Sequence, residues 1–420
     1  MRLKSTAKQP GLPLIFLAGG PGGSGIRQTR GPALPLFLAL REVGDVILLD
    51  QRGTGLSRPV LDSTITWDLP LDKPGEPRLL LPLCKDRLRT AAREFTKQGV
   101  DLSAYNPAEV ADDIESVRIA IGAKRVNLWG VSYGTYIALT TIRRHDESVH
   151  RAVLTSVVGP DQALLKRPTA IQEQLERVEA ALREDPKAAK VLPDFLAGLR
   201  HLLEQLDKQP VSVELTDPRG GKAVQVVVGK WDLQFFLGNQ IGRTFSLKSL
   251  PAFCTPLLRG DFQPLAKAAR DFRRGPVGNL MAWQMLCASG VSEQRRAEIE
   301  RTTDGTLLGN AVNFPFPEIG DALSLPDLGS ALRAPLQSKT PVLFISGTLD
   351  GECPLADVSE IQGGFAKHSS LVVEGASHGF DLFYFAPGLK GHMIEFLSGG
   401  DFRARRITMT PFRFNPFKVD

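Results

Sequence analysis

The segment Gly130-Val131-Ser132-Tyr133-Gly134 constrains what this chain can fold into more than any other feature. The apolar run at 125–129 predicts a short buried strand before it, and the pattern at 135–145 predicts a helix after it. A serine at a sharp turn between strand and helix exposes its hydroxyl at the carboxyl edge of a sheet, and the glycines make room for that turn. The pattern indicates a nucleophile elbow, although it also fits a glycine-rich turn with a bystander serine.

Short apolar runs and helical patterns alternate along the first part of the chain. Six runs, rich in branched residues and ending in turn residues, predict strands at 13–18, 45–49, 125–129, 152–158, 341–346 and 370–373. Helical patterns lie between the first four of them, at 33–41, 107–121 and 135–145. Near-continuous apolar strands that alternate with helices predict a mostly parallel sheet with helices on both faces.

A long insertion separates the fourth strand from the fifth. The gap is about 180 residues, far more than a crossover connection needs. Leucine spacing predicts helices in its first part, and the runs 211–215 and 224–228 around a Pro/Gly turn predict a hairpin. We therefore expect an α/β core formed by 1–160 and 336–420, with a mainly helical cap at 161–335 inserted before the last two strands.

Composition excludes several classes of protein. The net charge of +5 over 420 residues is spread in short arginine clusters, without the basic stripe and interleaved aromatic residues of a nucleic-acid-binding surface. No apolar run approaches the roughly 18 residues of a membrane helix. The first five residues lack the apolar segment of a signal peptide. We expect a soluble, cytoplasmic protein that binds neither nucleic acid nor membrane.

The cysteines are few and widely spaced. Cys84, Cys254, Cys287 and Cys353 form no CxxC pair, which argues against a metal site of that type and against a disulfide framework. We expect four thiols, with one disulfide bond left open for an exported form.

A serine hydroxyl is a poor nucleophile unless a base activates it and an acid orients that base. In chains with such an elbow the order is serine, acid, histidine, and the last two follow late strands. Asp350 comes just after the run at 341–346, and His378 follows the next run in a loop of small residues. The sequence therefore predicts a catalytic triad of Ser132, Asp350 and His378, with Glu352 as a rival acid.

A glycine-rich loop, Gly19-Gly20-Pro21-Gly22-Gly23-Ser24-Gly25, follows the first predicted strand. Its exposed N–H groups suit an oxyanion hole, for which we expect the backbone N–H groups of Tyr133 and Gly20, with Gly19 as the nearest competitor. A phosphate-binding loop is the alternative. The Lys-Ser/Thr pair of a P-loop is missing from this segment, and its spacing does not fit G-x-G-x-x-G.

With these motifs the chain resembles the α/β-hydrolase fold peptidases of the prolyl iminopeptidase and tripeptidyl aminopeptidase family. The resemblance rests on the glycine loop, on Asp50-Gln51-Arg52-Gly53-Thr54-Gly55-Leu56-Ser57, on the elbow, and on 347–350 and 375–379, in family order across nearly the whole chain. Asp50 and Arg52, at a strand end, are expected to support the glycine loop by a charge-assisted hydrogen bond. The resemblance implies release of one or a few residues from the free amino terminus of a peptide.

The chain departs from the family pattern in two places. Similar proteins often carry an acidic residue two positions after Cys287, where this chain has Ser289; the nearest acid is Glu293. The residue that would bind the amino group of the substrate, the amine anchor, is therefore not identified by the sequence. Other candidates in the cap lie on one helical segment: Glu173, Glu176 and Glu179. The two strands that usually open this fold are expected to be missing, which would place the strand at 45–49 at or near an exposed edge. A lost leader would make the protein an exported one.

We expect a serine hydrolase that needs no metal or organic cofactor. The favoured activity is an aminopeptidase for small or proline-containing amino termini of peptides. A carboxylesterase acting on small esters is the first alternative, and a hydrolase-like binding protein without turnover is the second. Oligomeric state stays open.

Overall fold

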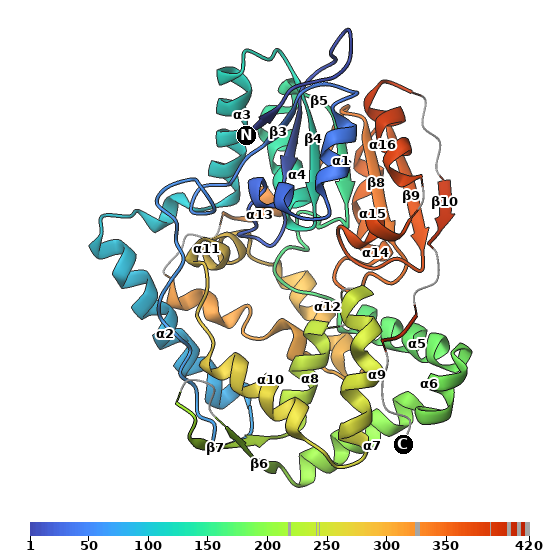
Figure 1. Ribbon diagram of the computed structural model, residues 1–420. Coiled ribbons are helices and arrows are strands. Elements are labelled where there is room, and N and C mark those ends of the chain that lie inside the picture. Colours follow the sequence, from blue (N-terminus) through green and yellow to red (C-terminus); the bar gives the residue numbers. More distant parts are fainter. Residues whose placement is uncertain are drawn as a thin grey trace.

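The computed structural model describes residues 1–216, 220–240, 242, 244–323, 328–386, 388–400, 405–409 and 413–415. Within these residues, eight strands form one sheet in the order β1-β3-β2-β4-β5-β8-β9-β10, and β6 and β7 form a separate hairpin. Figure 1 shows the large sheet in one half of the molecule and most of the inserted helices in the other half.

The strands of the large sheet are β1 (Arg2–Leu3), β2 (Leu14–Leu17), β3 (Val46–Leu48), β4 (Val126–Val131), β5 (Val149–Thr155), β8 (Val342–Gly347), β9 (His368–Glu374) and β10 (Arg405–Thr408). The helices outside the insertion are α1 (Leu34–Leu40), α2 (Pro77–Lys97), α3 (Pro107–Ala120), α4 (Tyr133–His145), α14 (Leu355–Ile361), α15 (Asp381–Phe385) and α16 (Leu389–Leu397).

The insertion holds α5 (Pro168–Glu184), α6 (Pro186–Val191), α7 (Phe195–Lys208), β6 (Val211–Thr216), β7 (Ala223–Val228), α8 (Lys230–Gln240), α9 (Thr244–Leu258), α10 (Gln263–Arg274), α11 (Leu280–Ser289), α12 (Glu293–Thr303) and α13 (Ser330–Arg333). Short 3₁₀ helices lie at Ile26–Arg30, Leu102–Ala104, Asp146–Ser148, Ala311–Asn313, Glu318–Ala322 and Gln362–Gly364.

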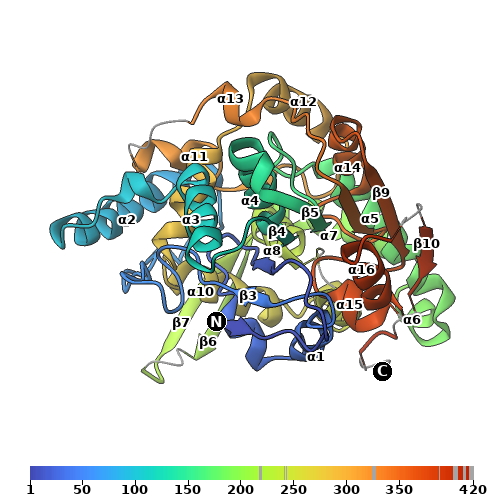
Figure 2. The same ribbon diagram turned by 90° about the horizontal axis from the view of Figure 1, so that it is seen from above.

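Alternation along the strands explains why both faces of the sheet are covered. Leu14 and Phe16 of β2 pack with α1, α15 and α16, whereas Ile15 and Leu17 pack on the opposite face with α3, α4 and α14. Figure 2, which looks at the molecule from above, shows these two groups of helices on opposite sides of the sheet. Because successive side chains point to opposite faces, a strand that is apolar at every position requires apolar partners on both. The predicted parallel sheet is confirmed in this respect.

The two edges of the sheet differ from the expectation. β3 lies next to the edge, as predicted, but the edge itself is β1, whose Arg2 and Leu3 pair antiparallel with Ile47 and Val46. At the other edge β10 pairs parallel with β9, so three strands rather than two follow the insertion. Both strands are short and mostly exposed, so neither produces the apolar run on which a sequence prediction depends.

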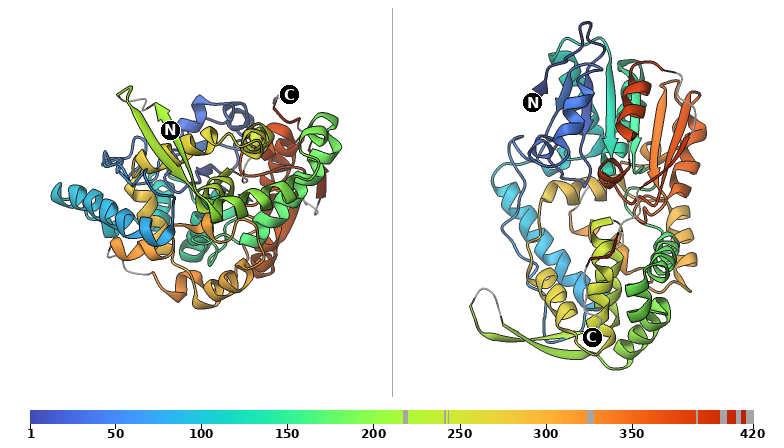
Figure 3. Two further views of the ribbon diagram at one scale, coloured as in Figure 1. Left: turned by 90° about the horizontal axis from the view of Figure 1, so that it is seen from below. Right: turned by 45° about the vertical axis from the view of Figure 1, so that its right-hand side comes forward.

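The insertion has an apolar core of its own, built from residues such as Leu175, Leu203 and Leu233. The predicted hairpin is present as β6 and β7, and Figure 3 shows it projecting from the end of the molecule away from the large sheet. The segment between β3 and α2 also contacts the insertion, since Val227 N donates to Leu71 O at 2.7 Å. We keep the division between a core (1–160 and 336–420) and a cap (161–335) as a proposal.

Among the described residues, no helix combines the length and the apolar character needed to cross a membrane.

Candidate active site

Ser132 occupies the turn between β4 and α4 with φ +55° and ψ −128°, a backbone conformation that residues other than glycine rarely adopt. The flanking glycines are required by close packing. A Cβ atom on Gly130 would lie 2.5 Å from the carbonyl oxygen of Gly134, and one on Gly134 would collide with the carbonyl oxygen of Leu17 in β2. The turn is therefore packed tightly against the neighbouring strand, and it presents Ser132 at the carboxyl edge of the sheet.

The structure brings Ser132, His378 and Asp350 together. Ser132 Oγ lies 2.9 Å from His378 Nε2. On the other side of the ring, His378 Nδ1 lies 2.9 Å from Asp350 Oδ2 and 3.0 Å from Asp350 Oδ1. The histidine is 8% exposed and the aspartate 4% exposed, so the contacts between them are shielded from water.

The chain around Asp350 orients its carboxylate. Oδ1 accepts hydrogen bonds from the backbone N–H groups of Glu352 at 3.0 Å and Cys353 at 2.8 Å. Glu352, the rival acid, instead pairs with Lys166, with 3.3 Å between Oε2 and Nζ. The side chain that contacts His378 Nδ1 is thus Asp350.

The electrostatic surroundings of His378 favour its charged form. Burial by itself lowers the pKa of the imidazole, but the negative charges of Asp350 and Glu352, together with the hydrogen bond to Asp350, outweigh burial and raise the pKa above its ordinary value. A base with a raised pKa holds a proton more readily, which suits a group that must accept one from a serine hydroxyl.

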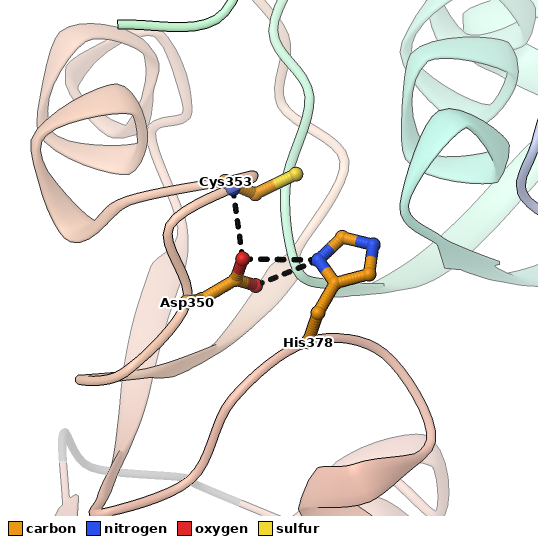
Figure 4. A group of neighbouring side chains, drawn as sticks. All are labelled: Asp350, Cys353 and His378. Carbon is orange, nitrogen blue, oxygen red and sulfur yellow. Dashed lines mark hydrogen bonds and ion pairs between the residues drawn. The ribbon is translucent and has the colours of Figure 1, made fainter. Parts of the chain in front are cut away.

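Cys353 lies beside this pair, as Figure 4 shows, and one nitrogen, oxygen or sulfur atom from each of Asp350, Cys353 and His378 lies within 4.8 Å of the others. The grouping invites the interpretation of a metal site. The surroundings do not fit one: the carboxylate is already engaged by two N–H groups and the imidazole, and burial raises the pKa of the Cys353 thiol well above its ordinary value. A thiol that stays protonated is a poor ligand, and we assign no metal here.

The glycine-rich loop after β2 runs directly beside the serine. A Cβ atom on Gly19 would lie 2.8 Å from Ser132 Cβ, so only glycine fits there. Gly20 has φ +122°, a conformation open to glycine and costly for other residues. Tyr133 is the first residue of α4, where backbone N–H groups have no partner within the helix. Of the predicted oxyanion-hole residues, Tyr133 therefore follows Ser132 directly in the chain, and Gly20 follows Gly19, whose backbone lies against Ser132.

Asp50 and Arg52 have different partners. Asp50 Oδ1 accepts hydrogen bonds from Ser24 Oγ at 2.6 Å and from Ile26 N at 3.0 Å, so it does support the glycine loop. Arg52 does not. Its guanidinium group pairs with Asp113 of α3, with 2.8 Å between Nη2 and Oδ1. The expectation for Arg52 was wrong because its long side chain points away from the loop toward the carboxylates of α3.

Sequence reasoning missed one supporting residue. The side chain of Gln51 is buried, and its Nε2 donates to the carbonyl oxygen of Ala18 at 3.1 Å, directly before the glycine loop. The only hint in the sequence was the position of Gln51 between Asp50 and Arg52 in the motif.

The position expected to hold an amine-binding acid is buried. Ser289, the last residue of α11, is fully buried, and its Oγ lies 2.8 Å from the phenol oxygen of Tyr133. Glu293 is exposed at the start of α12. Of the α5 carboxylates, Glu179 accepts a hydrogen bond from Leu196 N, and Glu176 accepts one from the side chain of Gln172; Glu173 is mostly exposed. The amine anchor therefore stays unassigned.

Comparison with known proteins places the chain in a family. The sequence profile described as alpha/beta hydrolase fold matches residues 13–245. A tripeptidyl aminopeptidase of Streptomyces lividans is 32% identical over 427 aligned residues, which cover 95% of this chain and 76% of that protein. A tripeptidyl aminopeptidase of Streptomyces coelicolor is 26% identical with the same two coverages. A probable proline iminopeptidase of Streptomyces coelicolor is 30% identical over 47% of this chain and 49% of its own length. The chain therefore belongs to the α/β-hydrolase family, among the relatives of tripeptidyl aminopeptidases and proline iminopeptidases.

Proposed function

We propose that this hydrolase is an aminopeptidase that cleaves peptides near their free amino terminus through an acyl-enzyme on Ser132. The single observation that carries the proposal is the continuous chain of contacts from Ser132 Oγ to His378 Nε2 and from His378 Nδ1 to Asp350. This arrangement supports nucleophilic attack by the serine on a carbonyl carbon, because the base and its orienting acid are both within hydrogen-bond distance.

In the proposed first step, Ser132 Oγ bonds to the carbonyl carbon of the substrate, and its proton passes to His378 Nε2. The imidazolium gives that proton to the leaving amine as the carbon–nitrogen bond breaks, which leaves an ester on the serine. A water molecule then attacks this ester and loses its proton to His378 Nε2. The bond between the carbonyl carbon and Ser132 Oγ breaks, His378 gives that proton to Oγ, and the acid leaves with the serine hydroxyl restored. Asp350 stabilises the charged imidazole throughout, which agrees with the raised pKa of His378.

The negative oxygen that forms on the substrate needs hydrogen-bond donors. We assign this role to the backbone N–H groups of Tyr133 and Gly20, with Gly19 as the alternative to Gly20. The close approach of the glycine loop to Ser132 supports the assignment, since donors must lie near the atom that the serine attacks. Loss of one such donor costs about 3 kcal/mol of transition-state stabilisation.

The preference for a free amino terminus is supported by the relatives. Two of them are named tripeptidyl aminopeptidase, and they align with 95% of this chain. We propose that the substrates are peptides with small or proline-containing amino termini, from which one to three residues are released.

A carboxylesterase is the second candidate, and one observation favours it. The position of the expected acid holds Ser289, which is buried and bonded to Tyr133 rather than facing a substrate amine. A site without an amine anchor would accept uncharged acyl groups.

A comparison of four substrates separates these candidates. We would measure kcat/KM for proline p-nitroanilide, for a proline-containing tripeptide p-nitroanilide with a free amine, for the same tripeptide N-acetylated, and for p-nitrophenyl butyrate. A strong preference for a free amine supports an aminopeptidase, and the better of the two free-amine substrates gives the length released. Turnover of the butyrate alone would make the protein an esterase. No turnover of any of them, with a correctly folded chain, would contradict both and favour a binding protein.

A further inference from the structure

We infer that three buried side chains of the insertion, Gln174, Thr244 and Ser289, are positioning residues that each hold one loop of the active site. The inference rests on the proposed function, because it assigns these residues a part in placing the triad and the oxyanion-hole donor. It changes the role of the insertion, which becomes part of the catalytic framework as well as a cover over the substrate.

The acid loop is held by α5. Gln174 Nε2 donates a hydrogen bond to the carbonyl oxygen of Leu349, and Arg177 Nη1 donates to that of Thr348. These carbonyl groups immediately precede Asp350. The contact is close on the other side as well, because a Cβ atom on Gly351 would collide with Gln174 Oε1. The backbone on both sides of the catalytic acid thus rests against one helix of the insertion.

The histidine loop is held at the start of α9. Thr244 Oγ1 lies 2.6 Å from Ser377 Oγ, and Thr244 N donates to Asp381 Oδ2 at 2.8 Å. Both hydroxyl-bearing residues are fully buried. The backbone N–H of His378 itself donates to the carbonyl oxygen of Gly242 at 3.2 Å. Ser377 and Asp381, together with the N–H of His378, therefore bond to Thr244, the first residue of α9, and to Gly242.

The elbow is held by α11. Ser289 Oγ lies 2.8 Å from Tyr133 Oη, and both hydroxyl oxygens lie within hydrogen-bond distance of the carbonyl oxygen of Met285, at 2.8 Å and 3.0 Å respectively. The phenol of Tyr133 is thereby fixed to the insertion, and Tyr133 is the residue whose N–H we assign to the oxyanion hole. Because the phenol and this N–H belong to one residue, fixing the side chain also restricts the backbone that carries the N–H.

These three contacts share one physical logic. The Thr244 and Ser289 contacts are buried and the Gln174 contact is partly buried, so water is a poor replacement for a lost partner. A hydrogen bond in a low-dielectric interior is both stronger and more costly to leave unmade. The three loops follow the ends of different strands. The sheet therefore brings the loops to one edge but does not by itself fix the positions of the side chains of Ser132, Asp350 and His378. Misplacement of a reacting group by about 1 Å can cost roughly a hundredfold in rate.

The sharpest test compares two threonines of α9. Thr244→Val removes the hydroxyl that faces Ser377. Thr255→Val removes an equally buried hydroxyl, whose Oγ1 donates at 2.7 Å to the carbonyl oxygen of Pro251 within the same helix. We expect Thr244→Val to lower kcat about ten- to a hundredfold with KM changed less than about twofold, and Thr244→Ser to recover most of the loss. Thr255→Val should keep the wild-type kcat. Equal effects of the two valine variants would overturn the inference.

A double-variant cycle tests the elbow contact. Ser289→Ala and Tyr133→Phe each remove one end of the same hydrogen bond and leave the backbone N–H of Tyr133 in place. If the bond positions that N–H, each variant lowers kcat and the double variant is little worse than the poorer single one. Purely additive losses, or unchanged kcat in both single variants, would contradict a positioning role.

Reaction of Ser132 with a fluorophosphonate probe separates failure of this inference from failure of the proposed function. The probe reports whether the serine is activated, whatever the natural substrate is. If the probe does not label the wild-type chain, both the proposed function and the positioning role are wrong. If it labels the wild type, Thr244→Val and Ser289→Ala at equal rates, the proposed function is retained and the positioning role is wrong. We expect labelling of both variants to be slower by the same factor as kcat.

Discussion

The main chain of Gly19 lies directly against Ser132: a Cβ atom on Gly19 would lie 2.8 Å from the Cβ atom of Ser132 and 2.6 Å from the carbonyl oxygen of Val131. Both contacts are closer than side chains tolerate, so the glycine loop must move if a methyl group is added. We predict that Gly19→Ala lowers kcat/KM by about a hundredfold or more, because the donor at Gly20 would no longer face the reacting carbonyl.

Gly31→Ala is the matched control for this prediction. Gly31 follows the same loop region, has φ −120°, and its added Cβ would meet nothing closer than the carbonyl oxygen of Gln28 at 3.9 Å. Its kcat/KM should stay within about twofold of the wild type, since surface changes away from special backbone positions have small effects. Similar losses in the two variants would mean that the loop responds to general destabilisation and not to crowding at Ser132.

Ser132→Ala should remove hydrolysis of every substrate and also labelling by fluorophosphonates. The side chain is small, and its hydroxyl contacts His378, so the fold loses little. We expect the melting temperature to change by no more than about two degrees. Thermal unfolding and progress curves on the same preparation check both parts. Activity retained in the variant would show that the nucleophile lies elsewhere.

The pH dependence of kcat/KM should report the surroundings of His378. The neutral imidazole is the active form, so activity rises with pH as the proton leaves, and the acid limb follows the pKa of His378. The negative charge of Glu352 contributes to raising that pKa. Glu352→Gln removes the charge, destabilises the imidazolium and lowers its pKa. We therefore expect the acid limb to move to lower pH.

A distant carboxylate provides the control for the pH profile. Glu374, in β9, pairs at the surface with Arg406, with 2.6 Å between Oε1 and Nη1. Glu374→Gln should leave the acid limb where it is in the wild type. A limb that moves to higher pH in Glu352→Gln, or that moves equally in both variants, would argue against a direct charge effect of Glu352 on the histidine.

The sequence was sufficient to predict which three side chains meet, because the fold does most of the placing. Ser132, Asp350 and His378 each follow an apolar run, and parallel strands of one sheet end at a common edge. A pattern that marks strand ends therefore also marks which side chains converge. The same reasoning found Asp50, because a carboxylate directly after β3 faces the loop that follows β2.

Other features could not be predicted because they depend on contacts between segments far apart in the chain. Tyr133 and Ser289 are 156 residues apart, and nothing in either local pattern pairs them. Arg52 had several carboxylates within reach, and only the packing of α3 selects Asp113. Strand β1 is two residues long and forms only through pairing with β3. Such features are consequences of packing, whereas the strand ends are local properties of the sequence.

The last prediction concerns how the insertion is fastened to the core. Asp357 in α14 is the buried centre of an ion-pair cluster: its Oδ1 lies 3.0 Å from Arg167 Nε and 3.1 Å from Arg295 Nη2, and both arginines belong to the insertion. Asp357→Asn leaves these two guanidinium groups short of a buried partner, so we expect the free energy of unfolding in urea to fall by about 3 kcal/mol. Glu360, in the same cluster, is 43% exposed, and Glu360→Gln should cost less than about 1 kcal/mol. The two losses of unfolding free energy are then compared. Removing a partner is costly only where the remaining charge is buried, so Asp357→Asn should lose more. An equal or larger loss in Glu360→Gln would mean that the exposed ion pairs hold the insertion to the core.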